Sequence, residues 1–499
     1  MAVAEERPSP PGEYGVVVVG SGPGGLQTSY SLGRLGIDHA VLSADDAPGG
    51  MFRRFPLYEN LISWTHEAEP EERRTRAYEA RDQNSLLADE PDLRALVPEH
   101  MAEGRRRPAR QEMEAGLAAF ADRAAIRVRY GCRWEATRRD DSGFVLVTSD
   151  GEYRSRAVVF AVGATEPWVP SIPGLELGDH YASLNGGRER FYGRRVVIIG
   201  KRNSAFELGE GLLIQGVSEL TLVSPRPAET GRLARSPLRP WYLTPYDEHV
   251  RGAPGRFVLD ASIERVERRE GGVAVHALER SHPETLVLEA DVVIAATGFQ
   301  VPLGDLREHG LATVANDRMP ALTPYWESVT LPRVFFAGNA TQASLGLRKH
   351  GVASLSSMVC GFRYNARLLA DHIAETLFGR ERARPRLDPE TVVPLLVDEL
   401  NDGPELAIQK GYLARAVRAG GDGGLRDEGV LPLEVFVDAE YDGAAATLEF
   451  DDEERICPVL YVRSGGELRE HLLPRHPLRR YDGPEYRDAI AEALSPLLS

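Results

Sequence analysis

A valine-rich run that leads into a glycine-rich turn opens the chain and constrains its fold more than any other feature. Residues 15–20 read Gly-Val-Val-Val-Val-Gly, which is typical of a parallel strand buried on both faces. Gly20, Gly22 and Gly25 follow with the spacing G-x-G-x-x-G, and a helical pattern covers 26–35. In this context the first glycine makes a tight turn, the second lets the backbone approach a pyrophosphate, and the third packs helix on strand. The pattern predicts a unit that binds a dinucleotide at a helix N-terminus.

The same arrangement recurs later in the chain. The first unit closes with a strand at 40–42, and a second unit begins at 194–200 with Arg-Arg-Val-Val-Ile-Ile-Gly. A helix from about Ser204 and a strand at 220–223 complete it. Arg202 stands where the second glycine is usual. Its side chain either narrows the backbone approach or contacts phosphate itself.

Two residues after the second unit's second strand bear on the choice of nicotinamide cofactor. Ser224 and Arg226 follow this strand, and a hydroxyl with a guanidinium suits a ribose 2′-phosphate. We therefore expect NADPH to be preferred over NADH. The alternative is that Arg226 is one more solvent-exposed arginine in an arginine-rich chain.

Three further segments follow the predicted strands. Ala-Ala-Thr-Gly-Phe at 295–299 resembles the motif that links NADPH and FAD domains, and Val162-Gly163 resembles its partner. Phe-Ala-Gly-Asn at 336–339 resembles the second FAD fingerprint, which reaches the ribityl chain. All these motifs stand in the expected order along the chain.

This order resembles the two-dinucleotide-binding-domain flavoproteins, which include flavin monooxygenases and thioredoxin-reductase-like enzymes. More closely, the chain resembles the family of the endoplasmic-reticulum flavoprotein associated with degradation, the FAD-dependent oxidoreductase domain-containing proteins. The residues that carry this resemblance are 22–27, 52–56, 61–63, 84–87, 203–207, 350–351 and 361–364. The resemblance covers roughly 15–375 and is much weaker beyond. No ER signal or retention tail is seen, so we do not expect the ER role to transfer.

The resemblance implies FAD and NADPH as cofactors, with binding residues for each. For FAD they are Gly20, Gly22, Gly25, Ser43, Gly50, Met51, Phe52, Trp134, Gly163, Gly338, Asn339 and His350. For NADP they are Gly200, Arg202, Asn203, Ser204, Ser224, Arg226, Thr297 and Gly298. Ser43 and Asn339 replace the family's acids, and each replacement loses a charge-assisted hydrogen bond worth roughly 1.5–3 kcal/mol. Asp45 or Asp46 is expected to compensate for the first loss.

A segment at 345–351 precedes a predicted long helix at 352–377. A helix N-terminus there would stabilise negative charge on the reduced flavin, and Lys349 or His350 would add to this effect. The alternative is that both side chains face solvent.

The predicted fold class is α/β, with two Rossmann-like, three-layer ββα dinucleotide-binding domains and a C-terminal α+β extension. We expect a discontinuous FAD domain at 14–175 and 320–380, with a helical insertion at about 67–123. The NAD(P)H domain is expected at 176–319 and the extension at 381–499. Within the extension we expect strands at 433–437, 446–450 and 459–462, and a final helix near 485–498.

Composition excludes several classes of function. The net charge of −16 argues against a nucleic-acid partner, and no apolar run approaches the roughly 20 residues that span a bilayer. The first 14 residues are polar and proline-rich, so we expect a cytoplasmic protein. The cysteines are Cys132, Cys360 and Cys457, and no CxxC pair exists. We expect a small-molecule substrate and no membrane partner, and a homodimer stays open.

The favoured function is a monooxygenase of secondary metabolism, which hydroxylates a small molecule at nitrogen or sulfur through a flavin C4a-(hydro)peroxide. The missing dithiol argues against direct thioredoxin-reductase chemistry. The alternatives are a reductase that passes electrons to a partner or small acceptor, and a non-catalytic flavin-binding protein. Arg54 and Asn84 are the candidates for lining the reaction site, against a purely structural hydrogen-bonding role.

Overall fold

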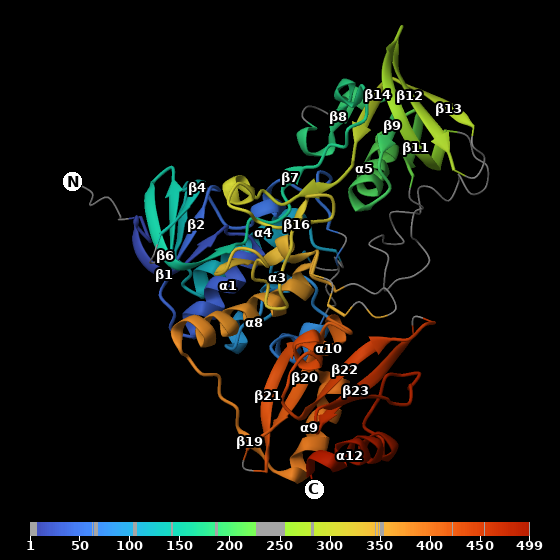
Figure 1. The fold of residues 1–499 in the computed structure, drawn as a ribbon. Helices are drawn as coiled ribbons and strands as arrows, with labels where there is room; N and C mark the ends of the chain where they lie inside the picture. The colour runs from blue at the N-terminus through green and yellow to red at the C-terminus, as the bar shows by residue number, and fades with distance from the viewer. Residues whose placement is uncertain are drawn as a thin grey trace. The chain divides into compact units, whose positions relative to one another are not determined.

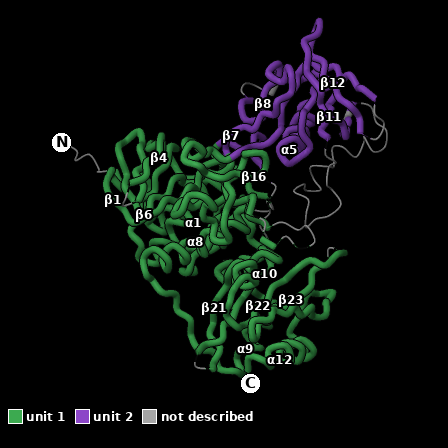
Figure 2. The backbone as a smooth tube through the Cα atoms, in the orientation of Figure 1, with its two compact units in different colours: residues 1–53, 63–164, 301–499 green, residues 54–62, 165–300 purple. Residues whose placement is uncertain are grey.

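The computed structural model (Figure 1) forms two compact units. The residues it describes are 7–61, 63, 68–102, 107–140, 143–184, 188–225, 255–280, 284–344, 346–347, 349, 354–421, 423–453 and 455–498. The first unit comprises Met1–Arg53, Ser63–Ala164 and Val301–Ser499, and the second comprises Arg54–Ile62 and Thr165–Gln300 (Figure 2).

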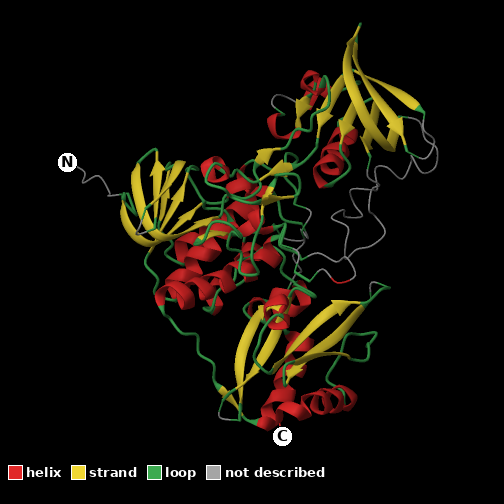
Figure 3. Cartoon of the chain, viewed as in Figure 1, coloured by secondary structure: helices red, strands yellow, loops and turns green. Residues whose placement is uncertain are grey.

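A mixed sheet forms the centre of the first unit. Its strands are β1 (Gly12–Val19), β2 (His39–Ser43), β3 (Val128–Tyr130), β4 (Trp134–Arg139), β5 (Phe144–Thr148), β6 (Gly151–Phe160) and β18 (Val334–Phe336). The order is β3-β2-β1-β6-β5-β4, and β18 pairs with β6. β3, β2, β1, β6 and β18 run parallel, and the buried apolar runs 16–19, 157–160 and 334–336 of β1, β6 and β18 are typical of such strands. Helices α1 (Pro23–Arg34) and α8 (Val359–Phe378) pack against each other in this unit (Figure 3).

The insertion after β2 is only partly helical. Its described helices are α2 (Pro70–Arg73), α3 (Leu96–Glu99) and α4 (Arg110–Arg123), with 3₁₀ turns η2 (Ala77–Ala80) and η3 (Pro91–Leu93). Prolines begin α2 and η3, because a ring at the first helical position has no N–H to leave unsatisfied. The other described residues of the insertion form turns, bends and irregular segments, and its longest helix is α4.

A second Rossmann-like sheet forms the second unit. Its strands are β8 (Asp179–His180), β9 (Arg195–Ile199), β10 (Glu219–Ser224), β11 (Arg256–Arg269), β12 (Gly272–Glu279), β13 (Thr285–Ala290) and β14 (Val292–Ala295). The order is β13-β12-β11-β10-β9-β14-β8, with a parallel half and an antiparallel β11–β13 meander. Helix α5 (Asn203–Ile214) connects β9 to β10, as the motif predicts.

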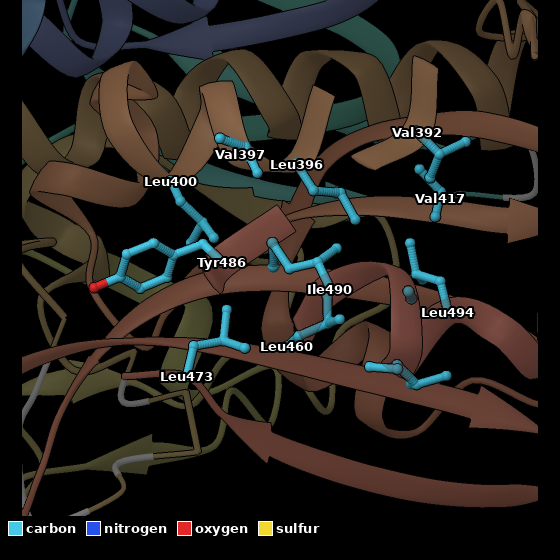
Figure 4. Packing of buried hydrophobic residues seen from close by; sticks show 14 of the residues in the cluster. Val392, Leu396, Val397, Leu400, Val417, Leu460, Leu473, Tyr486, Ile490 and Leu494 are labelled. Atoms are coloured by element: carbon cyan, nitrogen blue, oxygen red, sulfur yellow. The ribbon is translucent and has the colours of Figure 1, made fainter. Parts of the chain in front are cut away.

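The C-terminal extension is an antiparallel sheet with helices. Its strands are β19 (Arg386–Leu387), β20 (Leu413–Ala419), β21 (Leu425–Pro432), β22 (Gly443–Phe450), β23 (Ile456–Ser464) and β24 (Glu467–Leu472), in the order β19-β21-β20-β22-β23-β24. Its helices are α9 (Pro389–Asp402), α10 (Pro404–Ile408), α11 (Leu433–Val437) and α12 (Pro484–Leu498). Leu396 and Leu400 of α9 share a buried core with Ile490 and Leu494 of α12 and Leu460 of the sheet (Figure 4).

The strand expected at 433–437 is wrong, because this segment is helix α11. Pro432 takes the extended N-cap conformation, and Leu433 and Phe436 are then buried on one helical face. A short apolar run of this kind fits a strand or a helix equally well. The two buried residues are three positions apart, which is the spacing of one helical face. The sequence also missed β20, β21 and β24.

Candidate functional site

The first glycine turn is built so tightly that side chains are excluded at two of its positions. Gly20 has φ +117°, and a Cβ there would lie 2.4 Å from the carbonyl oxygen of Ala161 at the end of β6. A Cβ on Gly25 would lie 1.9 Å from the carbonyl oxygen of Gly20. Gly22 is the N-cap of α1, so no side chain occupies the positive end of this helix.

Two segments distant in sequence meet this turn. A Cβ on Gly24 would lie 2.4 Å from the Cα of Gly338, and a Cβ on Gly50 would lie 3.1 Å from the Cα of Gly22. Gly338 reaches the turn because Val19 and Phe336 both align with Phe160, so β1, β6 and β18 end level. The carboxyl ends of parallel strands are where such folds bind dinucleotides. The turn at 20–25, Gly50 and Gly338 therefore form one cradle.

The cradle has features that fit a ligand. Gly22 differs from its neighbours, since a Cβ there would meet only the Cα of Gly50, at 3.8 Å. Asn339 lies next to Gly338, and among the described residues its buried Oδ1 has no hydrogen-bond partner. A buried carbonyl oxygen without a donor is costly, and a ligand hydroxyl would satisfy it. Both features fit the pyrophosphate and ribityl hydroxyls of FAD.

Ser43, expected at the adenosine ribose, ends β2 and is buried. Its Oγ accepts a hydrogen bond from Ser21 Oγ at 2.8 Å and from the N–H of Asp45 at 3.2 Å. The hydroxyl proton of Ser43 remains available for a ligand oxygen. Asp46, one of the two expected substitutes for the missing acid, forms an ion pair with Arg53.

Other expected FAD residues take defined positions in the first unit. Gly50, Met51 and Phe52 form a 3₁₀ turn, η1 (Gly50–Arg53). Trp134 begins β4, and its ring packs over Gly304, where a Cβ would lie 2.6 Å from the indole. Gly163 follows β6 with φ +65°. Contacts of Trp134 and the 50–52 segment with a flavin stay predictions.

The helix expected to begin at 352 is wrong in its start, because α8 begins at Val359 with Met358 as its N-cap. Lys349 is only partly exposed and pairs with residues of the C-terminal extension, and its expected effect on the reduced flavin stays a prediction. Its ammonium donates to Glu449 Oε2 at 2.9 Å and Tyr461 Oη at 3.1 Å, and forms an ion pair with Glu470, all in the C-terminal extension. His350 lies outside the described residues.

Asn84 is buried and makes structural hydrogen bonds. Its Oδ1 accepts from Ser63 Oγ at 2.5 Å, and its N–H donates to Asp82 Oδ1 at 2.8 Å. Neighbouring residues of the same motif attach the insertion to the helices. Gln27 of α1 exchanges two hydrogen bonds with the backbone of Leu87, at 2.7 and 3.2 Å. The structural role weighed for Asn84 therefore has support, and its place at the reaction site stays a prediction.

Arg54 belongs to a segment that is part of the second unit. Glu207 of α5 holds this segment, since its Oε1 accepts the N–H of Tyr58 at 2.8 Å. Its Oε2 accepts the hydroxyl of Tyr181 at 2.7 Å. Burial raises the pKa of Glu207 to about 7, against the lowering effect of these two hydrogen bonds. Glu207 carries no predicted role from the sequence, although it lies within 203–207, one of the segments that carry the family resemblance.

The second unit repeats the first glycine turn. Gly200 has φ +143°, and a Cβ there would lie 2.3 Å from the carbonyl oxygen of Ala296 after β14. Arg202 is the exposed N-cap of α5. Among the described residues the buried Oδ1 of Asn203 has no hydrogen-bond partner, and Ser204 follows it in the first turn. This turn thus offers a helix N-terminus and an unsatisfied amide to a second nucleotide.

The linking motif and the end of β10 complete the second unit's candidate site. Thr297 Oγ1 donates to the carbonyl oxygen of Trp168 at 2.6 Å, and Gly298 has φ +98°. Ser224 ends β10 and aligns with Asp260 on β11, whose carboxylate pairs with the buried Lys201. Arg226 lies outside the described residues.

Arg280 was missed by sequence reasoning. Its Nη1 donates to the carbonyl oxygen of Pro225 at 2.5 Å, and its N–H donates to the carbonyl oxygen of Asp260 at 3.0 Å. The guanidinium therefore stands beside the end of β10, where a ribose would bind. No local sequence pattern indicates this position. Arg280 comes near the end of β10 only because β12 pairs antiparallel with β11, which itself pairs with β10.

Two Rossmann-like sheets, each with a glycine turn before a helix N-terminus, define a two-dinucleotide-binding oxidoreductase fold. Residues 17–338 match the pyridine nucleotide-disulphide oxidoreductase family, and the chain belongs to it. Membership implies use of FAD and a nicotinamide dinucleotide. Within the described part of the chain, no helix is long and apolar enough to cross a membrane and no cluster of potential metal ligands occurs.

Known proteins similar to this chain include oxygenases and reductases. FAD-dependent oxidoreductase domain-containing protein 2 of Danio rerio is 31% identical over 222 residues, which are 42% of this chain and 30% of that protein. The match thus spans about a third of the relative's length. A ferredoxin–NADP reductase of Salinispora tropica is 28% identical over 340 residues, 66% of this chain and 87% of that protein. A flavin-containing monooxygenase from Stenotrophomonas maltophilia has a TM-score of 0.53 at 22% identity, covering 72% of this chain and 98% of its own. This last similarity concerns the fold.

Proposed function

We propose that the chain is an FAD-dependent, NADPH-using monooxygenase that oxygenates a small molecule at nitrogen or sulfur. The observation that carries the proposal is the state of its cysteines. Cys132, Cys360 and Cys457 are buried, lie far apart in sequence, and form no disulfide. Burial raises the pKa of Cys132, and it raises that of Cys457 to about 11. These two are therefore poor thiolate nucleophiles, and the chain has no CxxC dithiol to receive electrons.

When bound, FAD would accept a hydride from the nicotinamide and deliver electrons to oxygen or another acceptor. The chain's own part is binding and orientation. The α1 N-terminus and the glycine turn would hold the pyrophosphate, while Asn339 Oδ1 would accept a ribityl hydroxyl. The α5 N-terminus would hold the nicotinamide dinucleotide, with Ser224, Arg226 and Arg280 at its 2′-phosphate.

A specific observation favours a second candidate, a reductase that passes electrons to a separate acceptor. The Salinispora ferredoxin–NADP reductase matches 66% of this chain. Such an enzyme also needs no internal dithiol. It differs from a monooxygenase in what the reduced protein does with oxygen, because oxygenation requires a site that excludes water while oxygen reacts.

Rapid mixing of anaerobically NADPH-reduced protein with oxygenated buffer separates these candidates. The proposal expects a transient absorbance spectrum distinct from those of both reduced and oxidised flavin, and it expects the transient to last longer when NADP⁺ is present. Direct return of the oxidised spectrum, together with fast turnover of a quinone or a ferredoxin, would establish the reductase. A protein that binds FAD but is not reduced by either nicotinamide cofactor would point to the non-catalytic alternative.

A further inference from the structure

A partly buried polar network joins described residues on the two sides of the stretch between η9 (Gly338–Thr341) and α8. Ser354 Oγ donates to the carbonyl oxygen of Ser344 at 2.7 Å, and it lies 2.8 Å from Ser356 Oγ. Ser356 Oγ accepts from Asn365 Nδ2 on α8 at 2.8 Å. The two ends of the segment are therefore tied to each other and to α8. We call the described residues of this stretch, 342–344, 346–347, 349 and 354–358, the pre-α8 segment.

The C-terminal extension supplies a central member of this network. Gln409, at the end of α10, is fully buried. Its Oε1 accepts the N–H of Leu355 at 2.8 Å, and its Nε2 donates to Asn365 Oδ1 at 3.0 Å. Removal of Gln409 would leave a buried donor and a buried acceptor unsatisfied, which is more costly than the loss of the bonds themselves.

A second contact of the extension lies at Gly346. This glycine has φ +56°, and a Cβ on it would lie 2.6 Å from the ring of Tyr412. The Tyr412 ring is thus packed directly on the backbone of the pre-α8 segment. Its hydroxyl accepts from Trp326 Nε1 at 3.0 Å, which fixes the ring in place.

The third contact is ionic and joins Lys349 to the extension's sheet. Glu449 on β22 is 3% exposed, and its Oε1 also accepts from Tyr461 Oη at 2.7 Å. A buried carboxylate is stable only with a close cation or several donors. Burial opposes the charge on Lys349, but hydrogen bonds to Glu470, Glu449 and Tyr461 outweigh it and raise the pKa of the ammonium.

The pre-α8 segment is directly continuous with the candidate FAD cradle. It begins after η9, which carries Asn339, and it ends at α8, which packs against both α1 and η9. We propose that the C-terminal extension is a positioning element of the flavin site, in which Gln409, Tyr412 and Glu449 hold the pre-α8 segment against the cradle. The inference rests on the proposed use of FAD, and it assigns the extension a role in cofactor binding.

The test compares Glu449→Gln with Glu467→Gln in the full-length protein. Glu449→Gln keeps the shape of the side chain and removes the charge that pairs with Lys349. The control changes an exposed residue of the same sheet that pairs with Arg469 at 2.8 Å. We expect about tenfold weaker FAD binding for Glu449→Gln, the factor that corresponds to one charge-assisted hydrogen bond. Amide hydrogen exchange at 354–358 should also become faster, and the control should change neither.

Lys349→Met and the double variant Lys349→Met/Glu449→Gln show whether loss of the Lys349–Glu449 contact causes the weaker FAD binding. Both single changes remove the same interaction, so the double variant should bind FAD no more weakly than the weaker single variant. If Glu449→Gln does not fold, Tyr461→Phe takes its place, because it removes the hydroxyl that contacts both Lys349 and Glu449 while it keeps the ring. A lower unfolding temperature with unchanged FAD affinity and unchanged exchange would overturn the proposal. A wild-type chain that binds no FAD would instead overturn the proposed function.

Discussion

Gly24 and Gly338 lie in backbone contact, so close that a Cβ on Gly24 would lie 2.4 Å from the Cα of Gly338. The contact joins the first turn of α1 to the segment after β18. A Cβ on Gly338 would lie 3.1 Å from the Cα of Gly24, and the φ of +69° at Gly338 adds backbone strain for any residue other than glycine. The FAD cradle therefore depends on two glycines that are far apart in the sequence.

Gly22→Ala is expected to abolish FAD binding and to leave the fold intact. A Cβ at this position meets only the Cα of Gly50 at 3.8 Å within the protein, but it would enter the space in front of the α1 N-terminus. Flavin absorbance of the purified variant measures the first effect and its unfolding temperature measures the second. Gly33→Ala on the exposed face of α1 is the matched control, and it should stay yellow and gain about 0.5–1 kcal/mol in stability. Yellow Gly22→Ala protein would contradict the assignment of the cradle.

Gly24→Ala is expected to act on the fold itself. Its Cβ would overlap the backbone of Gly338, and overpacking of this kind costs about 1–3 kcal/mol or more. The measurement is the urea midpoint of the apo protein, compared with that of Gly22→Ala. Equal midpoints for the two variants would show that η9 can move away from α1.

Asn339→Asp is expected to tighten FAD binding by about tenfold, because a carboxylate accepts a stronger hydrogen bond than an amide oxygen. The same change should destabilise the apo protein, since the oxygen at this position is buried and has no partner among the described residues. Isothermal titration calorimetry of the apo protein with FAD gives the affinity, and the unfolding temperature without FAD gives the loss of stability. Asn339→Leu should weaken FAD binding.

Arg280→Ala is expected to raise the Michaelis constant for NADPH about tenfold and to leave that for NADH nearly unchanged. Its guanidinium lies at the carbonyl of Pro225, beside Ser224, and only NADPH carries a phosphate there. Arg226→Ala should act in the same direction. Arg269→Ala, an exposed arginine on β11, is the control. Equal losses with both cofactors would contradict a 2′-phosphate role.

Glu207→Gln is expected to make the chain more stable than the wild type at pH 8 and nearly equal to it at pH 4.5. The pKa of the buried Glu207 is about 7 in the folded chain against an ordinary 4.5, so between these values the folded chain binds more protons than the unfolded chain. Stability contributed by the neutral acid is therefore lost as pH rises through this window, by about 3 kcal/mol in total. The check is the difference in urea midpoint between variant and wild type across this range. A difference that does not vary with pH would show that Glu207 stays ionised.

The two nucleotide-binding units and the order of their motifs could be predicted from the sequence. Each unit is marked by a motif of about ten consecutive residues, namely a β-branched strand, a glycine turn and the start of a helix. The local sequence of such a motif is sufficient to predict its backbone conformation. β1, α1 and β2 were found this way, as were β9, α5 and β10, and the structure confirms these elements. The extension's α+β class was also predicted, although several of its strands were not.

The tertiary structure alone decided which residues meet. Lys349 and Glu449 are a hundred positions apart, and no local pattern relates them. The same holds for Arg280 and Pro225, and for Gln409, which binds the backbone just before α8. The apolar pattern predicts that this helix begins at 352, whereas α8 begins at Val359. A pattern of apolar residues carries no information on hydrogen bonds that distant segments make to the backbone. Local propensity determines where strands, turns and helices form, whereas long-range packing and the satisfaction of buried polar groups determine where they end and what they contact.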